Sequence, residues 1–160
     1  MTVQALPPLI SSAAFWLLAA LVVGLGANQL PLRWLTTVER RPPRVPPQRH
    51  PGHSVVLGTP GIRTWKHWIP DAGGVLPGGV RKASLVRRDP AALRRLVVET
   101  RRAELVHWLL WPAGLLTALW LPPSGLLVNV VFATLFNLPC VLLQRFNRAR
   151  LRRCLARMGA

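Results

Sequence analysis

The chain has 160 residues, with 21 Lys and Arg, 5 Asp and Glu and a formal net charge of +16, and 51% of its residues are hydrophobic. It is too short for two globular domains, and a disordered basic segment would not contain so many apolar residues. The charges are also segregated, because residues 1–32 and 105–144 contain no Asp, Glu, Lys or Arg. Since a membrane-spanning helix needs about 20 mostly apolar residues, the pattern predicts an all-α integral membrane protein that forms a single domain.

The first predicted element is a membrane span over residues 9–27. Pro7 and Pro8 precede this apolar segment and Pro31 follows it, and proline commonly marks the limits of a helix. The segment lacks the Lys/Arg cluster of a secretory signal, and its small residues do not form a clear cleavage site. We therefore expect it to remain in the mature protein as the first of about three transmembrane helices.

A long basic loop is expected over residues 33–104. Nine prolines and seven glycines lie between residues 42 and 90, which argues against long regular elements there. Within this loop, the apolar and basic stretch 62–69 contains Trp65 and Trp68. Tryptophan favours the membrane interface, so we expect this stretch to lie close to the membrane.

The last part of the loop, residues 90–104, is predicted to form a basic amphipathic helix at the membrane surface. Asp89 is a suitable N-cap, and Pro90 suits the first helical position. Apolar residues recur at helical spacing while the arginines take other faces. Such a helix is attracted to anionic lipid headgroups, and it is positioned to continue directly into the next span.

The uncharged run of residues 105–144 is too long for one crossing. As a single helix it would measure about 60 Å, which is about twice the thickness of the hydrocarbon core. The Pro-Pro-Ser-Gly sequence at residues 122–125 favours a turn. We therefore predict a second span over residues 105–121 and a third over residues 126–143, followed by a basic tail over residues 145–160.

The two charged segments are expected on the same side of the membrane. Residues 33–104 carry 15 Lys and Arg, the tail carries the other 6, and the turn between the second and third spans carries none. Positively charged segments favour the cytoplasm, and three spans place both segments there. The predicted orientation has the N-terminus outside and the C-terminus inside, in a multi-pass protein of the plasma membrane.

Polar residues near the cytoplasmic ends of the second and third spans are candidates for a functional site. Glu104 and His107 are three residues apart and share a helix face. In the third span, four polar residues fall within about 80° of helical arc. This polar stripe comprises Asn129, Asn137, Cys140 and Gln144. Polar side chains at membrane depth usually face a bundle interior or a cavity, and they often serve function.

Each candidate also has a purely structural interpretation. The carboxylates can form ion pairs with arginines three residues away on the same helix. His107 can bond a backbone carbonyl, and Asn137 can satisfy a carbonyl freed by Pro139 or join two helices. Cys140 fits a role as a small packing residue. The local ion pairs are Glu104 with Arg101 and Glu99 with Arg102.

Two catalytic schemes use the sequence Glu104-x-x-His107. In acyl transfer, a histidine removes the proton of an attacking hydroxyl, a carboxylate orients the imidazole, and a cation or amide stabilises the oxyanion. A carboxylate-bridged di-iron site needs this motif on two helices with further carboxylates, but the motif occurs once and the chain has five acids. Residue count therefore favours acyl transfer, with no metal and no other cofactor. Nucleic-acid binding is not expected, because the arginines lie beside spans that bring them to lipid phosphates.

Three strings of the sequence resemble a known family. They are Trp65-Lys66-His67 with Asp71 and Gly73, the run from Glu99 to Trp108 (ETRRAELVHW), and Asn137-Leu138-Pro139 followed by the run from Gln144 to Leu151 (QRFNRARL). In order and spacing, over about residues 65–151, they resemble the glycosyl-diaponeurosporenoate acyltransferases of staphyloxanthin-type carotenoid synthesis. Residues 1–60 are similar to that family only in their leading apolar segment, and the loop after the first string departs from the family at residues 68–70 and 72.

The resemblance implies a bacterial membrane enzyme that moves a fatty acyl group from an activated donor such as acyl-CoA to a sugar hydroxyl of a carotenoid glycoside. His107 is then the general base, Glu104 its orienting carboxylate, and Asn137 or Arg145 the partner of the oxyanion. Further substrate-binding residues are expected in the three strings, with donor phosphates near the basic ones: Lys66, His67, Asp71, Glu99, Gln144, Asn147 and Arg148. The alternative is a non-catalytic membrane scaffold, or a lipid-binding partner of a pigment-synthesis enzyme.

The predicted orientation can be tested with single cysteines in a chain whose own two cysteines are replaced by serine. A cysteine in place of Ser124, in the uncharged turn, should react with a membrane-impermeant reagent added to intact cells. A cysteine in place of Ala83, in the basic loop, should react only after lysis, because positive segments stay in the cytoplasm. The opposite labelling pattern would contradict the predicted orientation.

Overall fold

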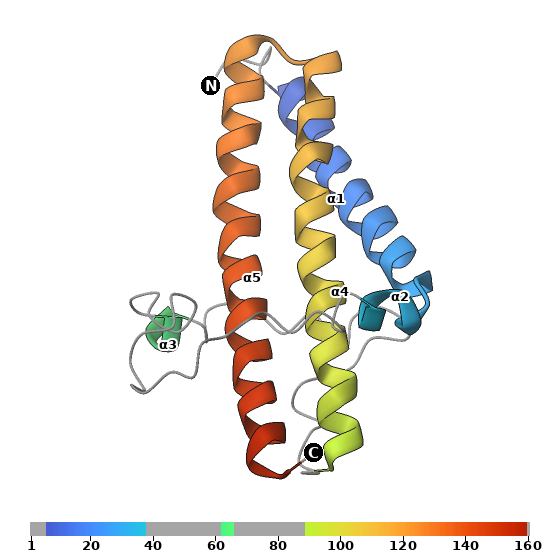
Figure 1. Cartoon of the computed structure of the whole chain (residues 1–160). Helices are drawn as coiled ribbons and strands as arrows, with labels where there is room; N and C mark the ends of the chain where they lie inside the picture. Colours follow the sequence, from blue (N-terminus) through green and yellow to red (C-terminus); the bar gives the residue numbers. More distant parts are fainter. Residues whose placement is uncertain (1–5, 38–61, 66–88, 160) are drawn as a thin grey trace.

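The computed structural model describes residues 6–37, 62–65 and 89–159. Its elements are α1 (Leu6–Gln29), α2 (Leu32–Thr37), α3 (Ile62–Trp65), α4 (Pro90–Leu115), the 3₁₀ helix η6 (Leu116–Leu119) and α5 (Pro123–Arg157). Figure 1 shows α4 and α5 side by side and antiparallel, with α1 leaning against the upper part of α4 and α2 close to its lower part. These described segments contain helices and no strand, which confirms the predicted all-α class.

Helix α4 begins where the sequence predicts. Asp89 has an extended backbone, and its carboxylate accepts a hydrogen bond from the N–H of Ala91 at 3.2 Å, while Pro90 takes the first helical position. The helix then runs without interruption to Leu115, so the basic helix expected over residues 90–104 and the start of the second span form one element. The apolar face of its first half is covered by protein, since three of its side chains are buried: Leu96, Val97 and Val98.

The turn between α4 and α5 lies slightly earlier than predicted. The end of α4 tightens into η6, and the N–H of Leu121 bonds to the carbonyl of Thr117 at 2.9 Å. Helix α5 already begins at Pro123, because proline fits the first helical position, where its missing N–H needs no partner. Of the four residues predicted to turn, only Pro122 lies outside the helix. Helix α5 continues to Arg157, so the predicted third span and most of the basic tail form one helix.

Two of the described helices are long and apolar enough to cross a membrane, α1 over Ile10–Gln29 and α5. They indicate a membrane protein, and large apolar side chains point outward from both, such as Leu17 (75% exposed) and Leu135 (68% exposed). In α4, the charged side chains of the first half leave a shorter apolar part, which η6 extends to Leu119. The second predicted span corresponds to this part, and the count of three spans stays a prediction.

Trp16 joins α1 to the α4–α5 pair. Its indole N–H donates to Oδ1 of Asn129 at 2.8 Å, and its ring lies 5.3 Å from that of Phe132. The ring also lies against Gly114, where an added Cβ would meet it at 3.0 Å. Asn129, a member of the predicted polar stripe, also donates to the carbonyl of Gly125 at 3.1 Å. Its side chain therefore serves helix packing.

Two arginines of α4 hold the corner between α1 and α2. Arg102 is 8% exposed, pairs with Glu99 at 2.9 Å and donates to the carbonyl of Leu30, just beyond α1, at 3.4 Å. Arg101 donates to the carbonyl of Leu35 in α2 at 3.5 Å. Carbonyls near helix C-termini lack partners inside the helix and attract cations. The local ion pair of Glu99 with Arg102 is thus confirmed.

Helix α3 packs against α5. An apolar cluster forms there from Ile62, Leu143 and Phe146, with Trp65 and Leu142 beside them. Ile62 is 2% exposed, so burial of apolar surface brings the start of the stretch 62–69 onto α5. The rest of that stretch lies outside the described residues.

Gly114→Leu should loosen the packing of α1, because the new side chain would need the space of the Trp16 ring, and overpacking typically costs about 1–3 kcal/mol. Gly26→Leu in α1 is the matched control, since an added Cβ there meets nothing within 4 Å. Thermal unfolding in one detergent should show a lower midpoint for Gly114→Leu and an unchanged one for Gly26→Leu. Equal midpoints would show that the contact with Trp16 does not hold α1 in place.

Candidate functional site

His107 and Asn137 form a polar pair between α4 and α5. Nδ1 of His107 lies 3.0 Å from Oδ1 of Asn137, and Asn137 is 4% exposed. The amide nitrogen of Asn137 donates to the carbonyl of Ala133 at 2.8 Å, so the amide is fixed with its oxygen towards the imidazole. Because Nδ1 faces an oxygen acceptor, it is the nitrogen that carries the proton when the ring is neutral. The lone pair then lies on Nε2, which is the state that a general base needs.

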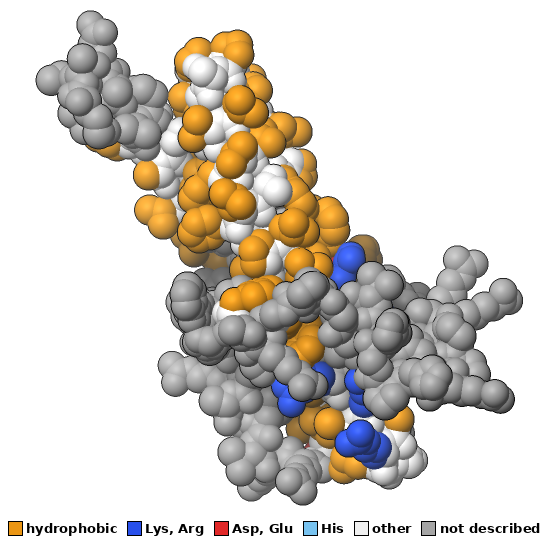
Figure 2. Space-filling view, turned by 90° about the vertical axis from the view of Figure 1, so that its left-hand side faces the viewer, with side chains coloured by type: hydrophobic (Ala, Val, Ile, Leu, Met, Phe, Trp, Pro, Cys, Tyr) orange, Lys and Arg blue, Asp and Glu red, His pale blue; other side chains and the backbone are white. Residues whose placement is uncertain are grey.

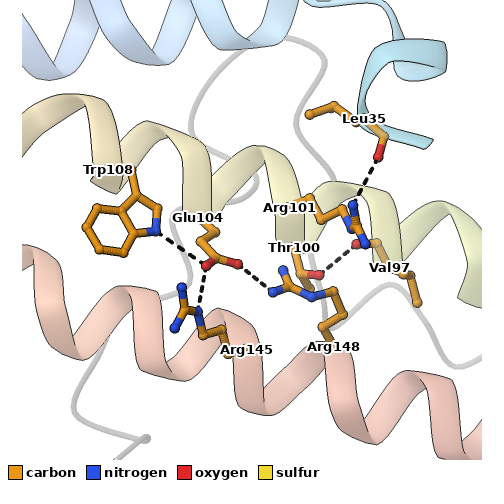
Figure 3. A network of polar contacts seen from close by, with 8 residues as sticks. All are labelled: Leu35, Val97, Thr100, Arg101, Glu104, Trp108, Arg145 and Arg148. Atoms are coloured by element: carbon orange, nitrogen blue, oxygen red, sulfur yellow. Dashed lines mark hydrogen bonds and ion pairs between the residues drawn. The ribbon is translucent and has the colours of Figure 1, made fainter. Parts of the chain in front are cut away.

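About one helical turn away, two arginines of α5 hold the carboxylate of Glu104 (Figure 3). It accepts from Nε of Arg145 at 2.6 Å and from Nη2 of Arg148 at 2.5 Å, and the indole N–H of Trp108 lies at 3.4 Å. The guanidinium of Arg145 also lies 5.9 Å from the centroid of the Trp108 ring, within cation–π range. These four residues are termed the Glu104 cluster. It joins the two helices through hydrogen bonds between charged groups, which are stronger than neutral ones.

The Glu104 cluster carries an excess of positive charge, because two guanidinium groups share one carboxylate. The side chains of Glu104 and Arg148 are 12% and 15% exposed, whereas that of Arg145 is 40% exposed. Partial burial acts to raise the pKa of the Glu104 carboxyl, but the hydrogen bonds and charges of Arg145 and Arg148 outweigh it and hold the pKa below its usual value. The carboxylate is therefore ionised at neutral pH, and Arg145 is the arginine that reaches the surface.

Two predicted substrate-binding residues on α5 have buried polar atoms, and one of them, Arg148, belongs to this cluster. Oε1 of Gln144 and Nη1 of Arg148 are buried and have no hydrogen-bond partner within the described part of the chain. The two residues are four positions apart and thus neighbours on one helix face. Buried polar atoms are nearly always paired, so this acceptor and this donor suit a water molecule or a polar group of a ligand.

The other predicted site residues fall elsewhere. Glu99 is engaged with Arg102 at the corner of α1 and α2, and Asn147 and Cys140 are half-buried on α5. Three further residues lie outside the described residues: Lys66, His67 and Asp71.

The predicted catalytic residues come together in two groups. The sequence predicts Glu104 as the orienting partner of His107, whereas in the structure Asn137 meets the imidazole and two arginines occupy the carboxylate. Reasoning along one helix finds neighbours three or four residues apart. It does not show which side chains of a facing helix compete for them.

Another polar contact of the α4–α5 pair involves a residue that was not predicted. The indole N–H of Trp111 donates to Oγ1 of Thr134 at 3.1 Å, and the Trp111 ring stacks on that of Trp108 with centroids 5.3 Å apart. Thr134 lies three residues before Asn137 and hence on the same face. That spacing is the signal in the sequence that assigns Thr134 to the polar stripe.

Glu104→Gln should remove an acid-sensitive part of the stability. The pKa of Glu104 in the folded chain lies below its ordinary value of 4.5, so its ionised form stabilises the fold above that value, and this contribution is lost as the pH falls through the lowered pKa. The variant should therefore unfold more readily than the parent near neutrality, since it leaves two partly buried arginines without their carboxylate. Thermal unfolding midpoints measured from about pH 7 to about pH 3 should converge at the acid end. A constant gap between the two proteins would contradict this.

Comparison with known proteins places these residues in a family. A family model described as glycosyl-4,4'-diaponeurosporenoate acyltransferase matches residues 57–157. A relative of the same description from Staphylococcus aureus (strain N315) is 30% identical over 93 residues, which are 56% of this chain and 54% of the relative. Another from Staphylococcus haemolyticus (strain JCSC1435) is 36% identical over 90 residues, which are 56% of this chain and 52% of the relative. No solved structure matches the chain.

The chain spans about half the length of the curated relatives it matches. The family match itself covers more than half of the chain, and it includes both the His107–Asn137 pair and the Glu104 cluster. The resemblance predicted from the three strings is confirmed, and the chain belongs to the glycosyl-4,4'-diaponeurosporenoate acyltransferase family.

Proposed function

We propose that this chain is a membrane acyltransferase that transfers a fatty acyl group from an activated thioester to a hydroxyl of a membrane glycolipid such as a carotenoid glycoside. The observation that carries the proposal is the His107–Asn137 pair, which places the lone pair of the neutral imidazole on Nε2, one helical turn along α4 from the positively charged Glu104 cluster. The description shared by the family model and the relatives supports the same class of reaction.

In this proposal the enzyme crosses the bacterial plasma membrane three times, with the N-terminus outside and the basic halves of α4 and α5 in the cytoplasm. From Pro123 to Asn137, α5 rises about 21 Å, so the His107–Asn137 pair lies in the cytoplasmic half of a hydrocarbon core about 30 Å thick. Glu104 and Arg145 lie at the boundary between the hydrocarbon core and the headgroups, where arginines also contact anionic lipid. A membrane-dissolved acceptor and a cytosolic donor can meet at this depth.

The proposed reaction is a direct acyl transfer. The acceptor hydroxyl oxygen attacks the carbonyl carbon of the thioester while Nε2 of His107 takes the hydroxyl proton. The tetrahedral intermediate carries its negative charge on the former carbonyl oxygen and collapses as the C–S bond breaks. The imidazolium then gives the proton to the leaving thiolate, so the products are an ester and a free thiol.

Asn137 takes the orienting role here, and Glu104 a supporting one. Asn137 holds Nδ1 of the imidazole, while Glu104 holds Nε of Arg145. The terminal nitrogens of Arg145 then serve the oxyanion or a donor phosphate. Gln144 and Arg148 offer their buried acceptor and donor atoms to a substrate hydroxyl or to water. Substrate-binding roles for four further residues stay predictions: Lys66, His67, Asp71 and Asn147.

A non-catalytic scaffold is the second candidate function, and one observation favours it. His107 and Asn137 contact each other across the interface of α4 and α5, as polar residues that only join two membrane helices also do. The two candidates differ in what His107 contributes. In the enzyme, its loss lowers the rate of acyl transfer, whereas in the scaffold its loss lowers only the stability of the fold.

His107→Ala should lower turnover by roughly 10²- to 10⁴-fold, the loss typical of a missing general base. The assay uses purified protein in nanodiscs with acyl-CoA and a carotenoid glycoside, and the amount of folded protein is measured alongside. Thr134→Val is the matched control, because it removes another polar contact of the same interface and should leave turnover nearly unchanged. A folded His107→Ala protein with near-full turnover would exclude His107 as the base.

A further inference from the structure

Four exposed arginines lie at the end of the α4–α5 pair that is remote from the apolar spans. Arg94 and Arg95 belong to the first turns of α4, and Arg153 and Arg157 to the last turns of α5. Among the described segments, none of these four, termed the distal arginines, has an ion-pair partner. Figure 2 shows basic side chains gathered in this lower part of the molecule, below an apolar upper part.

The distal arginines lie beyond the lipid headgroups in the proposed membrane placement, on which this inference rests. Along α5, Arg153 and Arg157 lie about 14 and 20 Å beyond Gln144, the last residue of the uncharged run. On α4, Arg94 lies about 15 Å before Glu104. The headgroup layer adds only about 5–7 Å on each side of the hydrocarbon core. Because α4 is one continuous helix, this placement moves Arg94 and Arg95 away from the membrane surface that the sequence predicts for residues 90–104, and lipid phosphates do not neutralise the distal arginines.

An apolar groove lies beside the distal arginines. Its volume is about 330 Å³. Val97, Val98 and Leu155 form its apolar lining and are almost fully buried, at 2%, 7% and 8% exposed, while the exposed Thr36 and Arg94 complete it. Arg94 therefore belongs both to the charged surface and to the groove. Protein partners typically bind with an apolar side chain in a pocket and polar contacts around it. Nucleic-acid phosphates are bound by basic side chains alone and do not require an apolar groove.

We propose that the acyl donor arrives as a thioester on a small acidic carrier protein, which docks on the distal arginines and places an apolar side chain in the groove. Acidic side chains of the carrier pair with the arginines, and complementary charge speeds the encounter. Acyl transfer then breaks the C–S bond to the carrier and forms the ester bond to the acceptor hydroxyl. The hydroxyl proton passes through His107 to the carrier, which leaves with a free thiol.

The distances along the helices separate this surface from the site that a small donor would use. In the proposed function, a phosphate of a small donor such as coenzyme A meets Arg145, the arginine of the Glu104 cluster that reaches the surface at the membrane boundary. The distal arginines and the groove lie about two to three helical turns further into the cytoplasm. A surface of this extent, combining separate charges with an apolar groove, fits a folded partner.

The test compares two donors with the same acyl chain, acyl-CoA and a purified acidic acyl carrier protein loaded with that chain, on enzyme in phosphatidylcholine nanodiscs. Changing the four distal arginines to Gln should raise KM for the carrier thioester roughly tenfold or more, while KM for acyl-CoA stays within about twofold. The matched variant with four Lys keeps the charge and should behave like the parent. Fluorescence anisotropy should show that the carrier alone binds the parent and the Lys variant more tightly than the Gln variant. This binding should weaken with added salt.

Two kinetic results would overturn the docking proposal while leaving the proposed acyl transfer intact. One is use of acyl-CoA without use of the carrier thioester, and the other is an equal rise of both KM values in the Gln variant. If neither donor is used, the proposed function fails, and the carrier affinities measured by anisotropy still test the docking proposal. The docking proposal is overturned if the Gln variant binds the carrier as tightly as the parent does. It is also overturned if the parent never binds the carrier but binds RNA or phosphatidylglycerol vesicles, and the Gln substitutions abolish that binding.

Discussion

The carboxylate of Glu104 fixes how α4 and α5 are aligned. A partly buried carboxylate needs charged partners, and both partners, Arg145 and Arg148, come from one face of α5. Because the helices are antiparallel, this contact also determines the contacts closer to the turn, where His107 meets Asn137 and Trp111 meets Thr134. A slip by one helical turn would separate each pair by about 5.4 Å. The geometry of the proposed base thus depends on an ion pair formed by other residues.

The contacts between the helices change in character along the bundle. At the arginine-rich end they are ion pairs, whereas towards the turn they are neutral, with the indoles of Trp111 and Trp16 donating to Thr134 and Asn129. The surroundings explain this change, since an isolated charge is costly inside hydrocarbon while a neutral hydrogen bond satisfies two polar side chains there. The helix bundle therefore suits water at one end and lipid at the other.

The sequence predicts those features that depend on neighbouring residues. Asp89 and Pro90 begin α4 as expected, and the helical periodicity places Asn129, Asn137 and Gln144 on one face. The turn is shifted because Pro123 suits the first position of a helix as well as it suits a turn. The partner of Glu104 depends on the facing helix, and the role of Gly114 depends on a tryptophan far away in the chain. Neither long-range contact follows from local spacing.

The short connection between α4 and α5 bears on how the protein enters the membrane. Contacts between two successive helices have low contact order, and such hairpins form early in folding. In the proposed orientation the connection is the part that crosses to the outside, and residues 120–125 carry no charge, so moving them through hydrocarbon avoids the cost of burying ions. The arginines at the other end never need to cross. The pair is therefore suited to insertion as a preformed hairpin, with its charged end determining which way it enters.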